Sequence, residues 1–519
     1  MSVSRLTAAA LIASLAACAV GPNFKRPTPP AATGYGSASS EQTAAANGAA
    51  NGAANGTANG TGNGTGNGAA GGAAGDAQRF VAGMDIPNQW WTLFRSAKLD
   101  RLVEQALEGN PNVAAAQAAL RQAHELYLAQ RTSFFPSVQG NFSGNRSEFP
   151  TNTLTSPTVA SSSTYTLYTA QLTLSYAPDI FGATRRQVEI ARAQADSARF
   201  QLEATYLTLS SNVVVTAIQE ASLRGQILAT ERSLQLEHQL TDLVQQQRHL
   251  GTASDLDVLA QQSLESQTAQ TLPPLQKQLG QTRDALTALL GQLPADEPQE
   301  TFRLDELALP TDLPVSLPSK LVEQRPDVRQ AEENLHMASA AVGVATADLL
   351  PQFAISADLG SSALSLSKLF TPYTQFWDAG ASLTQTLFDA GSLIHKRRAA
   401  YAGLDQAGAQ YRAAVVLACQ NVADTLRALK ADADALNASA TAERAAKKTF
   451  DLAQQQRALG TISLVIVLNA EQAYNTAALS LVQAQANRYA DTAALFQALG
   501  GGWWHRMEEP HERVSPKGE

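Results

Sequence analysis

The sequence predicts a mainly α-helical chain that is internally duplicated and that carries one pair of β-strands in each copy. Three observations predict this fold class: a repeat of most of the chain, long stretches of helical periodicity, and one pair of alternating strands in each copy. The repeat is clearest in the ten residues that begin at Leu243, which return with two changes at Leu452.

The two copies align with an offset that changes only once. The offset is 215 residues up to Pro136 of the first copy and 209 residues from Gly182 onward. The change in length must therefore lie between these two positions, so each copy has a rigid frame and one tolerant insert. We expect two repeats, residues 88–300 and 301–500.

The N-terminus has the pattern of an export signal over residues 1–17. Arg5 supplies the positive start, and the apolar run that follows is too short to span a bilayer as a helix. The run ends in Leu-Ala-Ala-Cys at Cys18, which resembles the lipobox of bacterial lipoproteins. That resemblance implies that Cys18 is lipidated, and Ala19 in place of Asp favours the outer membrane. An ordinary cleavage site with a chance cysteine is the less favoured alternative.

Two segments have the composition of flexible chain. Within the N-terminal segment 18–87, residues 36–76 are an Asn-Gly-Ala-Thr tract that cannot bury a core, so we expect a flexible tether. Residues 501–519 are expected to form a polar tail. The only other cysteine is Cys419, so the sequence predicts no internal disulfide framework.

Composition and motifs exclude several classes of function. The net charge is −8 and no basic stripe is present, which argues against nucleic-acid binding. The seven histidines have no metal-binding spacing, and the chain has neither a phosphate-binding loop nor a nucleophile elbow. We therefore predict no enzyme, metal or cofactor. No run of 18 apolar residues occurs, so any membrane crossing would have to use a β-barrel.

Each repeat is expected to begin with an amphipathic helix and to continue, after the strands, into a much longer one. Pro111 and Pro326 interrupt the first helix of the two copies and predict a kink or a break. The long helix of the first copy runs from Gly182 to Leu250, which is 69 residues and roughly 100 Å at 1.5 Å per residue.

A Leu-Gly-Thr turn should then reverse the chain in each copy, because glycine adopts positive φ at little cost. Shorter helices return over 254–290 and 463–499. Pro273 and Pro274 occur only in the first of these, where we expect a kink.

The strand pairs lie at about 136–178 and about 351–388. In each, apolar residues alternate with small polar ones over about ten positions, which is typical of transmembrane barrel strands and also of a soluble hairpin. Four strands cannot close a barrel, since small closed barrels need about eight. If the strands enter a membrane, the chain must therefore assemble with other copies of itself.

The chain resembles the outer-membrane efflux proteins, and most closely their lipidated NodT-type branch. The segments that carry the resemblance are Cys18 to Pro27, Trp90-Trp91, Pro111, Pro136, Asp179 to Gly182, both Leu-Gly-Thr turns, Arg325 to Val328 and Leu499 to Trp503. The resemblance implies a homotrimer with a 12-stranded β-barrel in the outer membrane of a Gram-negative bacterium and a long periplasmic α-helical barrel.

In such an assembly the chain would be a passive exit duct for drugs or other small molecules. A periplasmic adaptor would join it to an inner-membrane transporter of the resistance-nodulation-division (RND) type, and Cys18 would carry the lipid. The class-distinct alternative is a structural or adhesive helical lipoprotein without a pore, which would leave the duplicated hairpins unexplained.

The resemblance also assigns positions. The turns would be the tips that contact the adaptor: Leu250, Gly251, Thr252, Ser254, Leu459, Gly460, Thr461 and Ser463. Relatives often carry an Asp and an Arg just after the second tip, where this chain has Asn469 and Gln472. Our hypothesis is a constriction held by Val465, Asn469 and Gln472 that depends less on salt than a charged gate.

Overall fold

The computed structural model describes residues 19–32, 34–35, 77–150 and 162–506. Cys18, the predicted tether and the chain beyond Arg506 lie outside these residues. Two compact units are present. One comprises residues up to 27, 119–198 and 330–412, and the other comprises 28–118, 199–329 and 413 onward.

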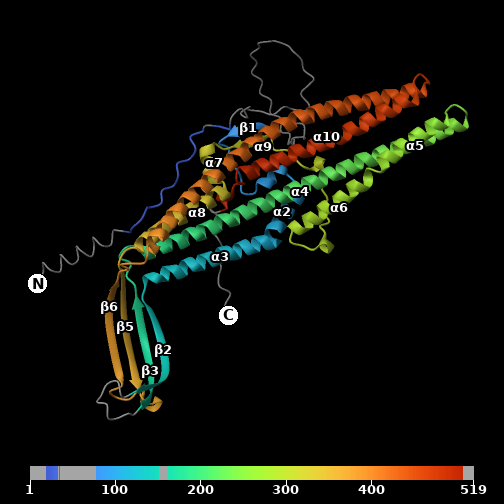
Figure 1. The fold of residues 1–519 in the computed structure, drawn as a ribbon. Helices are drawn as coiled ribbons and strands as arrows, with labels where there is room; N and C mark the ends of the chain where they lie inside the picture. The colour runs from blue at the N-terminus through green and yellow to red at the C-terminus, as the bar shows by residue number, and fades with distance from the viewer. Residues whose placement is uncertain (1–18, 33, 36–76, 151–161, 507–519) are drawn as a thin grey trace, which may run out of the picture. The chain divides into compact units, whose positions relative to one another are not determined.

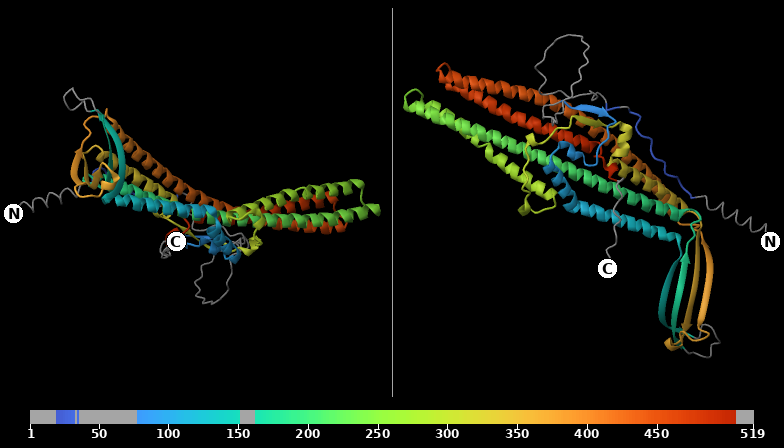
Figure 2. Two further views of the ribbon diagram at one scale, coloured as in Figure 1. Left: turned by 90° about the horizontal axis from the view of Figure 1, so that it is seen from below. Right: turned by 180° about the vertical axis from the view of Figure 1, so that it is seen from behind.

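The first unit contains a four-stranded antiparallel sheet in the order β2-β3-β5-β6 (Figure 1). Each repeat contributes one pair of neighbouring strands, and the pairing of β3 with β5 joins the two repeats. The strands β2 and β6 lie at the edges, as both further views also show (Figure 2). The bounds are β2 Ser137–Pro150, β3 Ser162–Tyr176, β5 Gln352–Ala363 and β6 Gln375–Thr384.

The sheet has one apolar and one polar face, because directly paired residues in neighbouring strands share a face. One cross-strand row contains Leu172, Leu359 and Trp377, whose exposed fractions are 53%, 62% and 77%. On the other face Asp358 lies between Thr173 and Asp378, and its Oδ1 accepts a hydrogen bond from Thr173 Oγ1 at 2.5 Å. A sheet with exposed large apolar residues on one side suits contact with lipid.

The helices follow the repeat. The first helix of each copy breaks at its proline, since Asn110 and Arg325 are extended at ψ 124° and 122°. The long helices α4 and α9 have 67 residues each. The predicted kink is a full break between α5 and α6, whereas the corresponding α10 is continuous. The bounds are α2 Ala97–Gly109, α3 Pro111–Arg131, α4 Ala183–His249, α5 Asp255–Ala269, α6 Leu272–Leu289, α7 Pro318–Gln324, α8 Pro326–Ala347, α9 Ser392–Ala458 and α10 Leu464–Ala498.

Among the described residues, no helix has an apolar stretch long enough to cross a membrane.

The second unit has an aromatic core that the sequence did not predict. Trp90 is fully buried in a 3₁₀ helix, η2 (Trp90–Phe94), and stacks on Phe496 of α10 with ring centroids 5.4 Å apart. Just before it, β1 (Arg79–Ala82) pairs in parallel with β4 (Asp312–Val315). The segment between the predicted tether and the first repeat is therefore structured.

The expectation of a polar tail from residue 501 is wrong for residues 501–506. Trp503, in the 3₁₀ helix η8 (Trp503–His505), is 6% exposed, and its Nε1 donates to the carbonyl of Gln324 at 2.6 Å. Gly500, Gly501 and Gly502 all have positive φ, so the glycines turn the chain back and bury an indole that would otherwise face water.

Candidate functional site

The two hairpin tips have the same backbone. Gly251 and Gly460 have φ of 75° and 74°, and nothing lies within 4 Å of where a Cβ would be. Glycine is therefore needed there for its conformation and not for space. In each tip the backbone N–H of the threonine that follows donates to the backbone carbonyl of the glutamine five residues earlier. The distances are 2.9 Å from Thr252 to Gln247 and 3.0 Å from Thr461 to Gln456.

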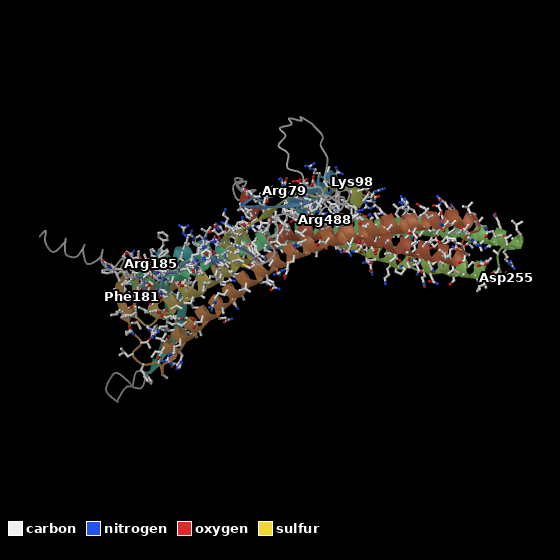
Figure 3. All side chains as sticks on the ribbon, turned by 90° about the horizontal axis from the view of Figure 1, so that it is seen from above. Arg79, Lys98, Phe181, Arg185, Asp255 and Arg488 are labelled. Carbon is white, nitrogen blue, oxygen red and sulfur yellow. The ribbon has the colours of Figure 1, made fainter. Side chains whose placement is uncertain are left out.

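The two tips differ in the residues after the turn. Ser254 and Asp257 form a reciprocal capping box, with Ser254 N donating to Asp257 Oδ2 at 2.9 Å and Asp257 N donating to Ser254 Oγ at 3.2 Å. Ser463, at the corresponding position, makes no side-chain cap. Arg248 and Asp255 form an ion pair across the first tip only, and Figure 3 shows Asp255 at the end of its hairpin.

Large apolar side chains are exposed at these tips. Leu250 and Leu459 are 79% and 78% exposed, and Leu256, just inside the first tip, is 76% exposed. The tips of the two copies are neighbours, because Arg457 Nη2 donates to Gln247 Oε1 at 3.5 Å.

The residues of the predicted constriction lie on one exposed face of α10. Val465 is 58% exposed, and Asn469 and Gln472 follow it at helical spacing and are also exposed. Asn469 and Gln472 line a groove of about 640 Å³ between α9 and α10, to which Ser439 also contributes. Glu471 points the other way and is fully buried, so the constriction face carries no charge from this run.

Residues 19–23 lie against the junction between β3 and α4. Val20 N donates to the carbonyl of Phe181 at 3.1 Å, and a Cβ on Gly182 would be 2.7 Å from the Cα of Ala19. Arg186 Nη2 donates to Asn23 Oδ1 at 2.6 Å. Phe181 and Arg185 are labelled at this junction in Figure 3.

The same segment continues along α8. The ring of Phe24 stacks on His336 with centroids 4.3 Å apart, and Arg26 pairs with Glu332 at 2.8 Å. His336 lies between Glu333 and Glu189, at 3.3 Å and 2.8 Å. Hydrogen bonds to these carboxylates raise the pKa of His336.

We expect the docking of this segment to weaken as pH rises. Because the pKa of His336 is raised, its stabilising contribution is complete below the ordinary histidine pKa and is lost as pH rises through the raised value. Cleavage after Lys25 by trypsin, normalised to an unfolded peptide of the same sequence, should therefore be faster at alkaline pH. His336→Ala should remove this pH dependence, and an unchanged profile in that variant would contradict the assignment.

Comparison with known proteins decides the family. The sequence profile of the family described as "Outer membrane efflux protein" matches residues 102–292 and 317–501. This chain belongs to the outer membrane efflux protein family. Its two matched segments correspond to the two copies of the internal repeat.

Individual relatives agree with this family. The chain is 29% identical to the pyoverdine export outer membrane protein OpmQ of Pseudomonas putida, over 80% of this chain and 89% of that one. It is 28% identical to the toluene efflux pump outer membrane protein TtgI of Pseudomonas putida, over 79% and 86%. Its fold matches the solved outer-membrane channel OprN with a TM-score of 0.81 and 26% identity, over 94% and 100% of the two chains.

This efflux protein is therefore an outer-membrane channel component of an efflux pump, located in the outer membrane, and it is not an enzyme. The predicted fold class is confirmed, because the chain shares the fold of a solved outer-membrane channel. Two features of the site were missed from the sequence. One is the docking of the N-terminal segment. The run Asn23 to Arg26 carried the family resemblance, but nothing in its residue pattern indicated these contacts. The other is the burial of Glu471, which no local pattern indicates.

Proposed function

We propose that the efflux protein is a homotrimer that forms the passive exit duct of a tripartite pump. The observation that carries this proposal is the open sheet, whose edge strands β2 and β6 have no further partner among the described strands. Unpaired backbone groups in lipid cost several kcal/mol each, so the sheet needs neighbours of its own kind. Three copies supply twelve strands and pair every edge.

A lipid on Cys18 fits the docking of the N-terminal segment. Cys18 precedes Ala19, whose backbone lies against Gly182 in the segment between β3 and α4. Acyl chains on Cys18 would anchor this end of the chain in the outer membrane, and we propose no cofactor.

The exposed leucines of the tips support contact with a periplasmic adaptor, which would connect the duct to an inner-membrane transporter of the RND type. The relatives export pyoverdine and toluene, so we propose small organic molecules, including drugs, as the substrates. The polar face of the sheet, with Gln171, Thr173 and Asp358, would line the outer part of the duct.

Single-channel recording in planar bilayers, together with the mass of the detergent complex, tests the proposal. We expect a trimer that produces discrete conductance steps and is closed most of the time. A monomer or dimer without conductance would instead leave a helical lipoprotein without a pore.

The uncharged constriction predicts a weak response to salt. Closure held by Asn469 and Gln472 should keep an open probability that changes less than about twofold between 0.1 M and 1 M salt, since screening acts on charges. Restoring the charges with Asn469→Asp and Gln472→Arg should make closure strongly salt-dependent. A strong dependence in the natural protein, lost on changing a nearby charged residue, would refute the hypothesis.

A further inference from the structure

Two glutamates, one on α4 and one on α10, are buried close to the predicted constriction, and Asn475, one turn beyond Glu471, donates to Glu237. Glu237 of α4 and Glu471 of α10 have no exposed surface. The adjacent core is apolar and includes Val244, Val467 and Ala470. Moving a carboxylate out of water into such surroundings is unfavourable unless a cation or several donors compensate it.

The hydrogen bonds around the pair do not supply that compensation. Glu237 Oε1 accepts from Thr268 Oγ1 at 2.8 Å and from Asn475 Nδ2 at 3.2 Å. Glu237 Oε2 and both carboxylate oxygens of Glu471 have no hydrogen-bond partner. The buried Gln261 Oε1, on the facing side of α5, also has none, although Gln261 Nε2 donates to the carbonyl of Glu237 at 3.3 Å.

Among the described residues, the helices that pack here bring no cation to the pair. From α5, Glu265 accepts from Thr241 Oγ1 at 2.7 Å and pairs with the exposed His238 at 3.1 Å. From α9, the facing residues are Phe450 and Ala453, and the Phe450 ring stacks on Tyr474 of α10. Over the described residues, neither Glu237 nor Glu471 has an Arg, Lys or His within ion-pair distance.

The electrostatics follow from this arrangement. Burial, with Glu265 as a smaller cause, raises the pKa of Glu237 to about 7. Burial, and then the charge of Glu237, raises the pKa of Glu471 to about 8. Four buried acceptor oxygens without donors in one cluster are satisfied most simply when protons are bound to the carboxyl groups.

We propose that Glu237 and Glu471 form a protonation switch that holds α10 against α4 and α5 when both are neutral and loosens it when they ionise. This inference rests on the proposed channel function. Asn469 and Gln472 are close to Glu471 in the sequence of α10 but lie on its exposed face, whereas Glu471 lies on its buried face. A displacement of α10 therefore moves the residues of the constriction directly. The switch takes the place of the ion pairs that this constriction lacks.

The direction of the response is fixed by the sign of the shifts. Both carboxyl pKa values are raised in the folded protein, so their contribution to stability is complete below the ordinary glutamate pKa of 4.5 and is lost as pH rises through about 7 and 8. The packed arrangement should therefore be most stable, and the channel most often closed, in acid. Alkaline pH should open it.

The experiment measures two quantities on the full-length protein between pH 5.5 and 9. One is the midpoint of thermal unfolding in detergent, and the other is the open probability in planar bilayers. For the natural protein we expect the midpoint to fall and the open probability to rise about tenfold or more across the transition. Glu471→Gln keeps the size of the side chain but stays neutral, so it should keep the acid values at every pH. Glu237→Gln should do the same in part.

The matched control is Glu231→Gln, which removes an exposed carboxylate from the same helix as Glu237 and should leave both profiles unchanged. If Glu471→Gln follows the natural profile, the switch is refuted. If Ca²⁺ or its chelation moves the midpoint at constant pH and Glu471→Gln abolishes this effect, a bound cation replaces the proton and the proposal is also refuted. Failure of the channel function would appear as absent conductance at all pH values, and the thermal profile would still test the pair.

Discussion

Arg283→Met will lower the free energy of unfolding by about 3 kcal/mol, because it leaves a buried carboxylate undercompensated. Arg283 Nη1 donates to Glu220 Oε1 at 2.8 Å, and Glu220 is fully buried. The same guanidinium donates to the carbonyl of Pro298 at 2.6 Å and pairs with Glu297, so it fixes the segment after α6. Arg224 remains as a second partner of Glu220, which limits the loss.

Chemical denaturation of the detergent-solubilised protein, followed by circular dichroism, measures this effect. The control is Arg427→Met, which removes an exposed pair with Asp424 and should cost less than about 1 kcal/mol. Replacing Arg283 and Glu220 together by apolar residues should restore most of the loss, since no unpaired charge is then buried. Equal effects of Arg283→Met and Arg427→Met would show that the buried pair contributes no more to the free energy of unfolding than the exposed pair does.

Leu250→Asp combined with Leu459→Asp will abolish transport by the assembled pump while leaving the channel itself intact. Both leucines are nearly four-fifths exposed at hairpin ends, where they support no internal core. If they are anchors in an adaptor interface, each should contribute about 2 kcal/mol, or roughly 30-fold in affinity. A charge at both positions should therefore reduce adaptor binding by about a thousandfold.

Binding of the adaptor to immobilised trimer measures the loss, and single-channel conductance checks that the duct is unchanged. The control is Leu293→Asp, which charges a leucine that is 71% exposed, lies after α6 and belongs to neither tip. Retained affinity in the double tip variant would move the adaptor contact elsewhere.

Local rules predicted much of this structure. The breaks at Pro111 and Pro326 and the turns at Gly251 and Gly460 each depend on one residue whose backbone preference is strong. Because of the internal repeat, each pattern occurs twice in the chain, so a weak strand pattern in one copy was supported by the same pattern in the other. Val465, Asn469 and Gln472 were assigned through the family resemblance, and the structure places them on one exposed face of α10.

Features that depend on distant partners were not predictable. The pairing of β1 with β4 joins Phe80 to Leu313, which lie 233 residues apart in the chain, through two four-residue strands that have no distinctive pattern. The burial of Trp503 depends on the carbonyl of Gln324. Glu471 sits in a run of polar residues that resembles any solvent-facing helix, and only the packing of α4 and α5 against it reveals a buried acid.

The unequal caps of the two hairpin ends have a consequence for stoichiometry. The first end is braced by the Ser254–Asp257 box and an ion pair, and the second has neither. A trimer would present six hairpin ends in alternation, three of each kind. Its ends would then have approximate sixfold symmetry in their backbone but only threefold symmetry in their side-chain contacts. Titration of adaptor onto the trimer should therefore resolve two classes of three sites, with the braced ends filled first because less motion is lost on binding.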